Sequence, residues 1–181
     1  MHMSRSEDLP DDALVAQAMV DRQAFADLYE RYRPSIYGYA LNRLGDPHLA
    51  EDVTSKVFLR AFRALPSYQS GSFRGWIFQI ARNTITDTYR RSRPTTTDDA
   101  LAAWPDPAPG PADVVEVHEA RAAVHRMIDQ LPDQQATIIR LRLHGMTGQE
   151  IADALGISLS AVKSAQFRAF NRIRDLMGDD R

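Results

Sequence analysis

Apolar residues recur at helical spacing along most of the chain, and the alternation typical of a half-buried strand is absent from the sequence. The pattern predicts helices at about residues 12–20, 22–43, 47–65 and 73–91. In the second helix, apolar and aromatic side chains repeat three and four positions apart from Phe25 to Ala40, which indicates a buried face. Pro34 lies inside this helix, and we expect it to kink the helix or divide it in two.

The third predicted helix opens with Asp46 before Pro47, a capping residue followed by the proline that a first turn accepts. Its packed side is predicted to hold Leu49, Val53, Val57, Phe58, Ala61 and Leu65. Glu51 and Asp52 fall in the first turn, where acidic side chains suit the helix dipole and stay open to a basic partner.

Residues Thr147 to Ile173 carry the local signals of a helix-turn-helix. Thr147 and Glu150 form the pair of a capping box, so a helix is expected to begin there. Gly156 suits the left-handed residue that closes this helix, and Ser158 can cap the next one. A break this short lets the second helix project into a DNA major groove.

The second of these helices has two different faces. Val162, Ala169, Ile173 and Leu176 share one side and are predicted to pack. The opposite side carries Ser160, Lys163, Ser164, Phe167, Arg168 and Asn171. Lys163 and Arg168 suit phosphates, and the hydroxyls suit phosphates or bases. A plain helical hairpin with a solvated polar face is the alternative interpretation of this segment.

The helix predicted at 73–91 carries a second polar stripe, formed by Gln79, Asn83, Thr86 and Arg90. Such a face could bind bases and phosphates, although arginines near a helix end also simply complement the dipole. Near the preceding loop, Phe73, Trp76 and Phe78 could stack on unpaired bases or belong to the core.

A proline-rich acidic stretch divides the chain. Residues 94–113 hold five of the ten prolines and four aspartates without a basic residue, which predicts a stiffened linker. Trp104 within it could dock on either domain or contact a partner. The sequence therefore predicts an all-α protein with two helical domains, 1–93 and 114–181, joined by this linker.

Composition narrows the function classes. The chain has 181 residues, 44% hydrophobic and 25% charged, with a net charge of −2 and no cysteine, so disulfides, thiol catalysis and cysteine zinc sites are excluded. Near-balanced charge predicts that DNA contact is local or assisted by a partner. The sequence contains neither a membrane-length apolar run nor a secretory leader, so we expect a cytoplasmic protein without membrane insertion. His118 and His125 are seven residues apart, and no His, Glu or Asp cluster in the sequence has the spacing of a metal site or an acid/base pair. We therefore expect no metal site and no enzymatic activity.

Three stretches in this order resemble the extracytoplasmic-function sigma factors of bacterial RNA polymerase, which belong to the sigma-70 family. They are DLYERYRPSIYGYALNRLGDPHLAEDVTSKVFLRAF, FRGWIFQIARNTITDTYRR and LPDQQATIIRLRLHGMTGQEIADALGISLSAVKS. The resemblance covers nearly the whole chain, from about Phe25 to Met177. It implies a specificity subunit that binds core RNA polymerase and promoter DNA, needs no cofactor, and is monomeric when free.

The resemblance also assigns roles to residues. The surface that binds core polymerase would include Glu51, Asp52, Leu59, Arg60 and Phe62, whereas Ser55 and Lys56 depart from the family pattern. The loop Ser67–Ser72 and the helix after it would capture a flipped base and read the minus-ten strand, through Ser72, Arg74, Trp76, Gln79, Asn83, Thr86 and Arg90. Minus-thirty-five recognition would fall to Ser160, Lys163, Ser164, Phe167 and Arg168.

Ala165 stands where many members of this family carry arginine, which predicts fewer contacts to the minus-thirty-five element. The resemblance further implies an anti-sigma factor that covers one of the binding faces until a signal releases it. A helix-turn-helix regulator that binds DNA without polymerase is the alternative, and strong DNA binding by the free protein would favour it.

Overall fold

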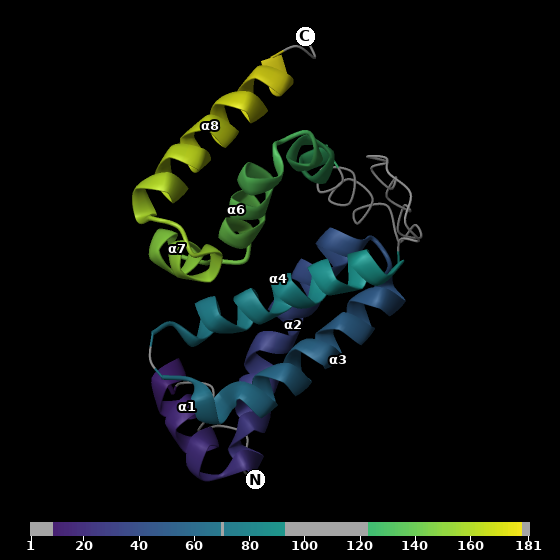
Figure 1. The fold of residues 1–181 in the computed structure, drawn as a ribbon. Coiled ribbons are helices and arrows are strands. Elements are labelled where there is room, and N and C mark those ends of the chain that lie inside the picture. Colours follow the sequence, from purple (N-terminus) through teal and green to yellow (C-terminus); the bar gives the residue numbers. More distant parts are fainter. Residues whose placement is uncertain (1–8, 70, 93–122, 179–181) are drawn as a thin grey trace, which may run out of the picture. The chain divides into compact units, whose positions relative to one another are not determined.

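The computed structural model describes residues 9–69, 71–92 and 123–178, and all regular structure in these ranges is helical (Figure 1). The chain separates into two compact units, Met1–Ala102 and Ala103–Arg181. The predicted all-α fold in two units is therefore confirmed. The predicted linker at 94–113, with Trp104, lies outside the described residues.

The first unit is built from α1 (Asp11–Val20), α2 (Phe25–Leu44), α3 (Pro47–Ala64) and α4 (Phe73–Ser92). Short 3-10 turns, Arg22–Ala24 and Leu65–Ser67, precede α2 and follow α3. Helices α2, α3 and α4 pack on one another, and α1 lies against α2 and α4 (Figure 1). Their shared core includes Leu14, Leu28, Ile36, Tyr39, Val53, Val57, Ile77 and Phe78.

Helix α2 continues through Pro34, so of the two predicted outcomes, a kink or a division, the division into two helices is wrong. Proline lacks the N–H that would bond to the carbonyl four residues earlier, here that of Glu30. Both Pro34 and Glu30 are exposed, so water can satisfy this carbonyl and the rest of the helix holds together by packing.

The start of α3 follows the prediction. The Asp46 carboxylate accepts hydrogen bonds from the backbone N–H groups of His48 at 2.8 Å and Leu49 at 3.1 Å. Leu49 itself is 36% exposed, so its predicted place in the core is wrong. The buried side of α3 is centred on Ala50 and Ala61, and Leu49 lies well to one side of it at 100° per residue.

The second unit contains a helical segment at 123–129, α6 (Asp133–Leu143), α7 (Gly148–Leu155) and α8 (Leu159–Gly178). Helices α6 and α7 both pack on α8 (Figure 1). One buried cluster joins the first segment to α6 and α8, and it consists of Ile128, Leu131, Ala136, Ile139 and Ala169 with Ile173 against it.

The start of α7 and the turn between α7 and α8 have the predicted caps. The Thr147 hydroxyl accepts from the Glu150 N–H at 3.2 Å, and the Glu150 carboxylate accepts from the Thr147 N–H at 2.7 Å. Gly156 closes α7 with φ of 65°, a conformation that other residues rarely adopt. The Ser158 hydroxyl then accepts from the Ala161 N–H at 3.2 Å. Local hydrogen bonding and one left-handed glycine thus set where α7 begins and ends and where α8 begins.

Candidate nucleic-acid interface

Helix α8 presents one packed face and one open face, as the sequence predicts. Val162 and Ala169 are fully buried in the second unit. All five candidate minus-thirty-five residues are exposed, and they are Ser160, Lys163, Ser164, Phe167 and Arg168. Phe167 is 68% exposed, so the open face offers an apolar surface as well as donors and cations. Such a mixture suits thymine methyl groups, base edges and phosphates together.

Ala165 is the exception on this helix. It is only 1% exposed and lies with Val162 and Ala169 on the packed side. The prediction that an alanine here removes a DNA contact is therefore wrong, because a side chain at this position points into the domain. The open face keeps its full set of donors without it.

The stripe predicted on α4 is also exposed. Gln79, Asn83, Thr86 and Arg90 all face solvent along one side of the helix. The Thr86 hydroxyl donates to the Arg82 carbonyl at 2.9 Å, which leaves the oxygen able to accept from a ligand. Gln79 and Asn83 carry amide groups that can pair with base edges.

Of the three candidate stacking residues at the start of α4, two belong to the core. Phe73 and Phe78 are each 1% exposed, so neither ring can stack on a base in this structure. Trp76 is half-buried, with its ring centroid 5.4 Å from that of Phe73. Only Trp76 of the three combines a ring supported from below with access from outside.

The loop before α4 is held by its own contacts. The Tyr68 ring lies 5.2 Å from that of Trp76, and its hydroxyl donates to the carbonyl of Gly71. Gly71 has φ of 108°, which only glycine adopts without strain. The half-buried Ser72 accepts from the Gly75 N–H at 3.1 Å and so caps α4. Tyr68 lies in the loop Ser67–Ser72 that the resemblance assigns to a flipped base, but it is not singled out there as a site residue. An aromatic side chain in a glycine-containing loop is the signal that could have identified it.

Arg74 turns back toward the domain. Its guanidinium carbon lies 6.0 Å from the ring centroid of Tyr32, a residue only 2% exposed. Burial raises the pKa of the Tyr32 hydroxyl, and a hydrogen bond to Asp11 adds to the rise, whereas Arg74 acts in the opposite direction. Arg74 is half-buried, so it can meet DNA only at the edge of the α4 face.

The candidate polymerase surface follows the outside of α3. Glu51, Asp52 and Leu59 are exposed, and Leu59 is 48% exposed although it is apolar. Lys56 forms an ion pair with Asp52, which neutralises one of the two predicted acidic contacts. Phe62 is half-buried, because its ring packs 5.2 Å from Phe25.

Arg60 does not simply point outward from α3. Its Nη1 donates to the Thr84 hydroxyl and to the Asp87 carboxylate on α4, both at 3.0 Å. The side chain that the resemblance assigns to polymerase is therefore bound within the domain, to the helix that carries the predicted minus-ten stripe.

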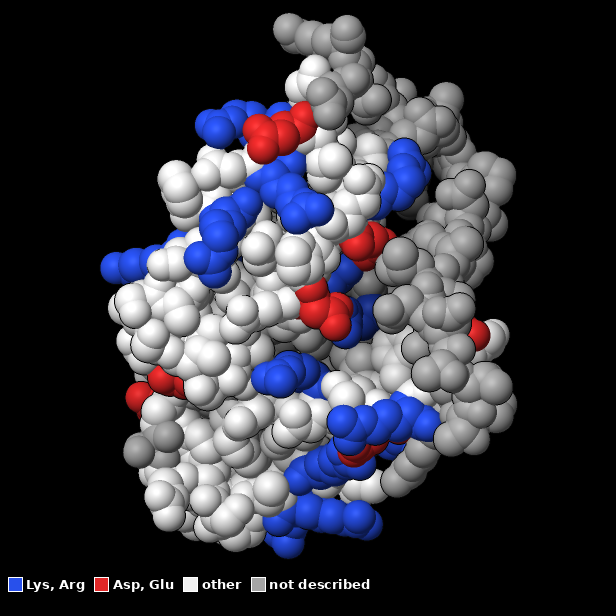
Figure 2. Space-filling view, turned by 45° about the horizontal axis from the view of Figure 1, so that its top comes forward, with Lys and Arg blue, Asp and Glu red and all other residues white. Residues whose placement is uncertain are grey.

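Basic side chains are more prominent than acidic ones on the face drawn in Figure 2.

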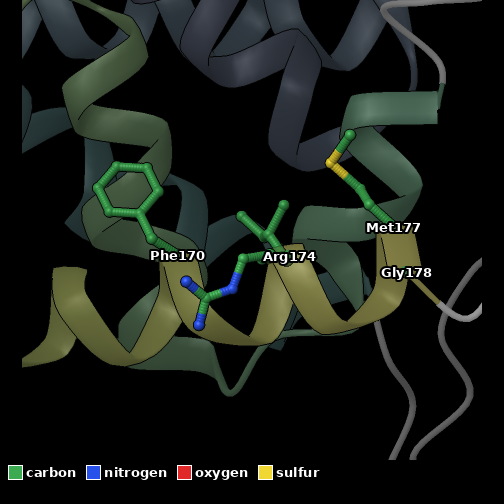
Figure 3. A pocket seen from close by; sticks show the side chains of 5 residues that line it. Phe170, Arg174, Met177 and Gly178 are labelled. Atoms are coloured by element: carbon green, nitrogen blue, oxygen red, sulfur yellow. The ribbon is translucent and has the colours of Figure 1, made fainter.

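A shallow hollow lies near the end of α8, and it is lined by Phe170, Ile173, Arg174, Met177 and Gly178. Figure 3 shows the side chains of Phe170 and Met177 on one side of the helix. They are 57% and 59% exposed, so this patch is apolar and open.

Metal-binding clusters and membrane-spanning helices are both absent from the described ranges. Within 9–69, 71–92 and 123–178, no group of three or more His, Asp or Glu side chains could hold a metal ion. Each helix of the described part is too short or too polar to cross a lipid bilayer.

The second unit holds a short-turn helix-turn-helix with an open polar face, and the first unit holds a helix with a second polar stripe. Together they define a DNA-binding protein of two helical domains. Residues 28–95 match the sigma-70 region 2 family, and residues 121–173 match sigma-70 region 4.

Individual proteins agree with these matches. The ECF RNA polymerase sigma factor RpoE of Cereibacter sphaeroides is 34% identical over 87% of this chain and 88% of its own length. The ECF sigma factor BldN of Streptomyces coelicolor is 34% identical over 88% of this chain, which spans 62% of BldN. Among solved structures, CnrH in complex with the cytosolic domain of CnrY has a TM-score of 0.73 at 26% identity, over 94% of this chain and 99% of CnrH. The chain belongs to the ECF sigma factors of the sigma-70 family.

Proposed function

We propose that this protein is an alternative sigma factor that binds core RNA polymerase and directs it to specific promoters. It is a specificity subunit and not a catalyst, since phosphodiester chemistry belongs to the polymerase. It acts in the cytoplasm, where the polymerase works, and is monomeric when free.

The observation that carries the proposal is the presence of one exposed polar helix face in each unit. On α8, Ser160, Lys163, Ser164, Phe167 and Arg168 would read the minus-thirty-five element in the major groove. On α4, Gln79, Asn83, Thr86 and Arg90 would read the minus-ten strand. Two weak contacts in one chain raise each other's effective concentration, so both elements are needed for firm binding.

Promoter opening would depend on the aromatic pair before and within α4. Extruding a base from the duplex costs a few kcal/mol. Stacking on an aromatic ring returns about 1–3 kcal/mol per base. Trp76 and Tyr68, supported by Phe73, offer that surface, with Ser72 at the loop and Arg74 at its edge. Stacking therefore offsets much of the cost of extruding the base, which favours a trapped base once polymerase holds the DNA in place.

The polymerase would bind the outside of α3, through Glu51, Asp52 and the exposed Leu59, with Phe62 at the edge of this surface. The resemblance adds Arg60, but its side chain is bound to Thr84 and Asp87 of α4 instead. An exposed leucine two helical turns from acidic residues on the same helix suits a partner with apolar and basic side chains. The Asp52–Lys56 pair leaves Glu51 as the stronger acidic contact of the two.

We also propose that an anti-sigma factor regulates this protein by covering a binding face. CnrH was solved with the cytosolic domain of another protein, CnrY. The open apolar patch of Phe170 and Met177 on α8 is of the kind that marks protein contacts, and it adjoins the predicted reading face, since Phe170 follows Phe167 by three residues.

Transcription by purified core polymerase on a promoter library tests the proposal. Addition of this protein should give transcripts from a subset of promoters that share minus-ten and minus-thirty-five sequences. Transcripts unchanged by the protein, together with tight DNA binding by the free chain, would favour the stand-alone regulator instead.

A further inference from the structure

The side chain of Arg60 spans from α3 to α4. Its Nη1 lies 3.0 Å from both the Thr84 hydroxyl and the nearer Asp87 carboxylate oxygen. The two charged side chains are 43% and 44% exposed, so the pair lies at the surface where α3 and α4 meet.

Asp87 lies beside the predicted DNA-reading stripe. It follows Asn83 by four residues and precedes Arg90 by three, and these spacings place side chains next to each other on a helix. A phosphate that approaches Asn83 or Arg90 would therefore also approach the carboxylate of Asp87. Uncompensated, this negative charge would repel the DNA backbone.

The ion pair has little to offer as a source of stability. Exposed pairs of this kind contribute about 0.2–1 kcal/mol to the free energy of unfolding. The pair has a larger effect on the binding of DNA. A phosphate close to α4 is repelled by the Asp87 carboxylate when that carboxylate is unpaired, and much less when Arg60 neutralises it.

We propose that Arg60 is a positioning residue for promoter DNA: its guanidinium neutralises Asp87 and thereby keeps the α4 stripe attractive to the minus-ten strand. The inference rests on the proposed sigma-factor function and changes the part that Arg60 plays in it. The main role of Arg60 is then on the DNA side of the domain and not in the polymerase contact.

The test compares Arg60→Ala with the double variant Arg60→Ala/Asp87→Asn, each assembled with core polymerase. Arg60→Ala should lower the fraction of open promoter by about three- to tenfold, the effect of one uncompensated charge near a phosphate. The double variant should recover wild-type opening to within about twofold, because the repelling charge is gone. The defect of Arg60→Ala should also shrink between about 0.05 M and 0.3 M salt, as screening grows.

Two controls keep the outcome interpretable. Arg63→Ala removes an exposed arginine of the same helix that forms no ion pair within the described part of the chain, so it should change opening by less than about twofold. Affinity for core polymerase, measured for every variant, should stay at the wild-type value.

Three results would overturn the inference. They are normal opening by Arg60→Ala, failure of Asp87→Asn to restore it, and loss of core affinity in Arg60→Ala that persists in the double variant. The wild-type protein is measured in the same assay. If it opens promoters, the proposed function holds even where this inference fails.

Discussion

The Tyr32 hydroxyl donates a hydrogen bond to the Asp11 carboxylate and so ties the first turn of α1 to α2. The same carboxylate accepts from Arg31 Nη1 at 2.9 Å. The Tyr32 ring packs 5.3 Å from that of Phe73, the first residue of α4. One buried tyrosine thus connects α1 to the segment that would hold a flipped base.

Loss of Asp11 should cost more stability than loss of the Tyr32 hydroxyl. Tyr32→Phe removes the hydrogen bond to Asp11, and a hydrogen bond of this kind is worth about 0.5–1.5 kcal/mol. Asp11→Ala should cost about 1–3 kcal/mol, because it leaves the buried hydroxyl and Arg31 without this acceptor. Thermal unfolding of both variants, with Tyr37→Phe at a half-buried tyrosine of the same helix as control, measures the difference. Equal losses in Asp11→Ala and Tyr37→Phe would contradict the assignment.

Asn83→Ala should impair promoter opening without affecting polymerase binding. If the exposed amide reads an unpaired base, its loss should raise the free energy of opening by about 1–3 kcal/mol, a typical cost per specific base contact. Permanganate footprinting reports opening separately from binding. Gln17→Ala, which removes an exposed amide from α1, is the control. Unchanged opening would mean that the stripe on α4 is only a solvated face.

Ala165→Arg should destabilise the second unit and add no DNA affinity. Ala165 is 1% exposed, so a larger and charged side chain must displace its neighbours or distort α8. Overpacking alone costs about 1–3 kcal/mol. Ser164→Arg, at the exposed position next to it, should leave the melting temperature unchanged within error. A stable Ala165→Arg variant with tighter promoter binding would restore the original prediction for this position.

The second unit should lose stability in mild acid through His144. Burial lowers the pKa of His144, and the charge of His125 acts in the same direction. An unfolded chain binds this proton near about pH 6.5, so the contribution of the neutral ring is present above that pH and is lost as the pH falls toward the folded value. His144→Asn should weaken the decline of the free energy of unfolding with falling pH. Urea unfolding from pH 5 to 8, in steps of about 0.5, measures this. His48→Asn, a change in the first unit, should leave the pH dependence of the second unit as it is. An NMR titration that places the His144 pKa above its ordinary value would refute this.

The helix-turn-helix was predictable because its determinants are local. Thr147 with Glu150, the left-handed Gly156 and the cap Ser158 each act within a few residues, and all take the expected conformation. The positions of Ala165 and Leu49 depend instead on which side of a helix meets its neighbours. A helical wheel identifies a face but leaves its edges open, and the Leu49 error falls at such an edge. The Ala165 error came from the resemblance, which compares residue types without regard to the side of the helix on which they lie.

Contacts between helices were beyond the reach of the sequence. Arg60 pairs with Asp87 across 27 positions, and Tyr32 reaches Asp11 across 21. Spacing rules connect side chains three or four residues apart, whereas these pairs follow from the packing of separate helices. The contact of Arg60 with Asp87, and that of Tyr68 with Trp76, both depend on tertiary structure. The sequence therefore assigned Arg60 to the polymerase and did not single out Tyr68.

Fluorescence anisotropy on one promoter fragment, with and without core polymerase at physiological salt, tests the central claim most directly. The net charge of −2 and the confinement of basic side chains to a few faces predict weak duplex binding by the free protein. A specific, tight complex should form only when polymerase is added. Nanomolar, sequence-specific binding by the free protein would contradict the account, since a subunit that depends on polymerase has no need of it.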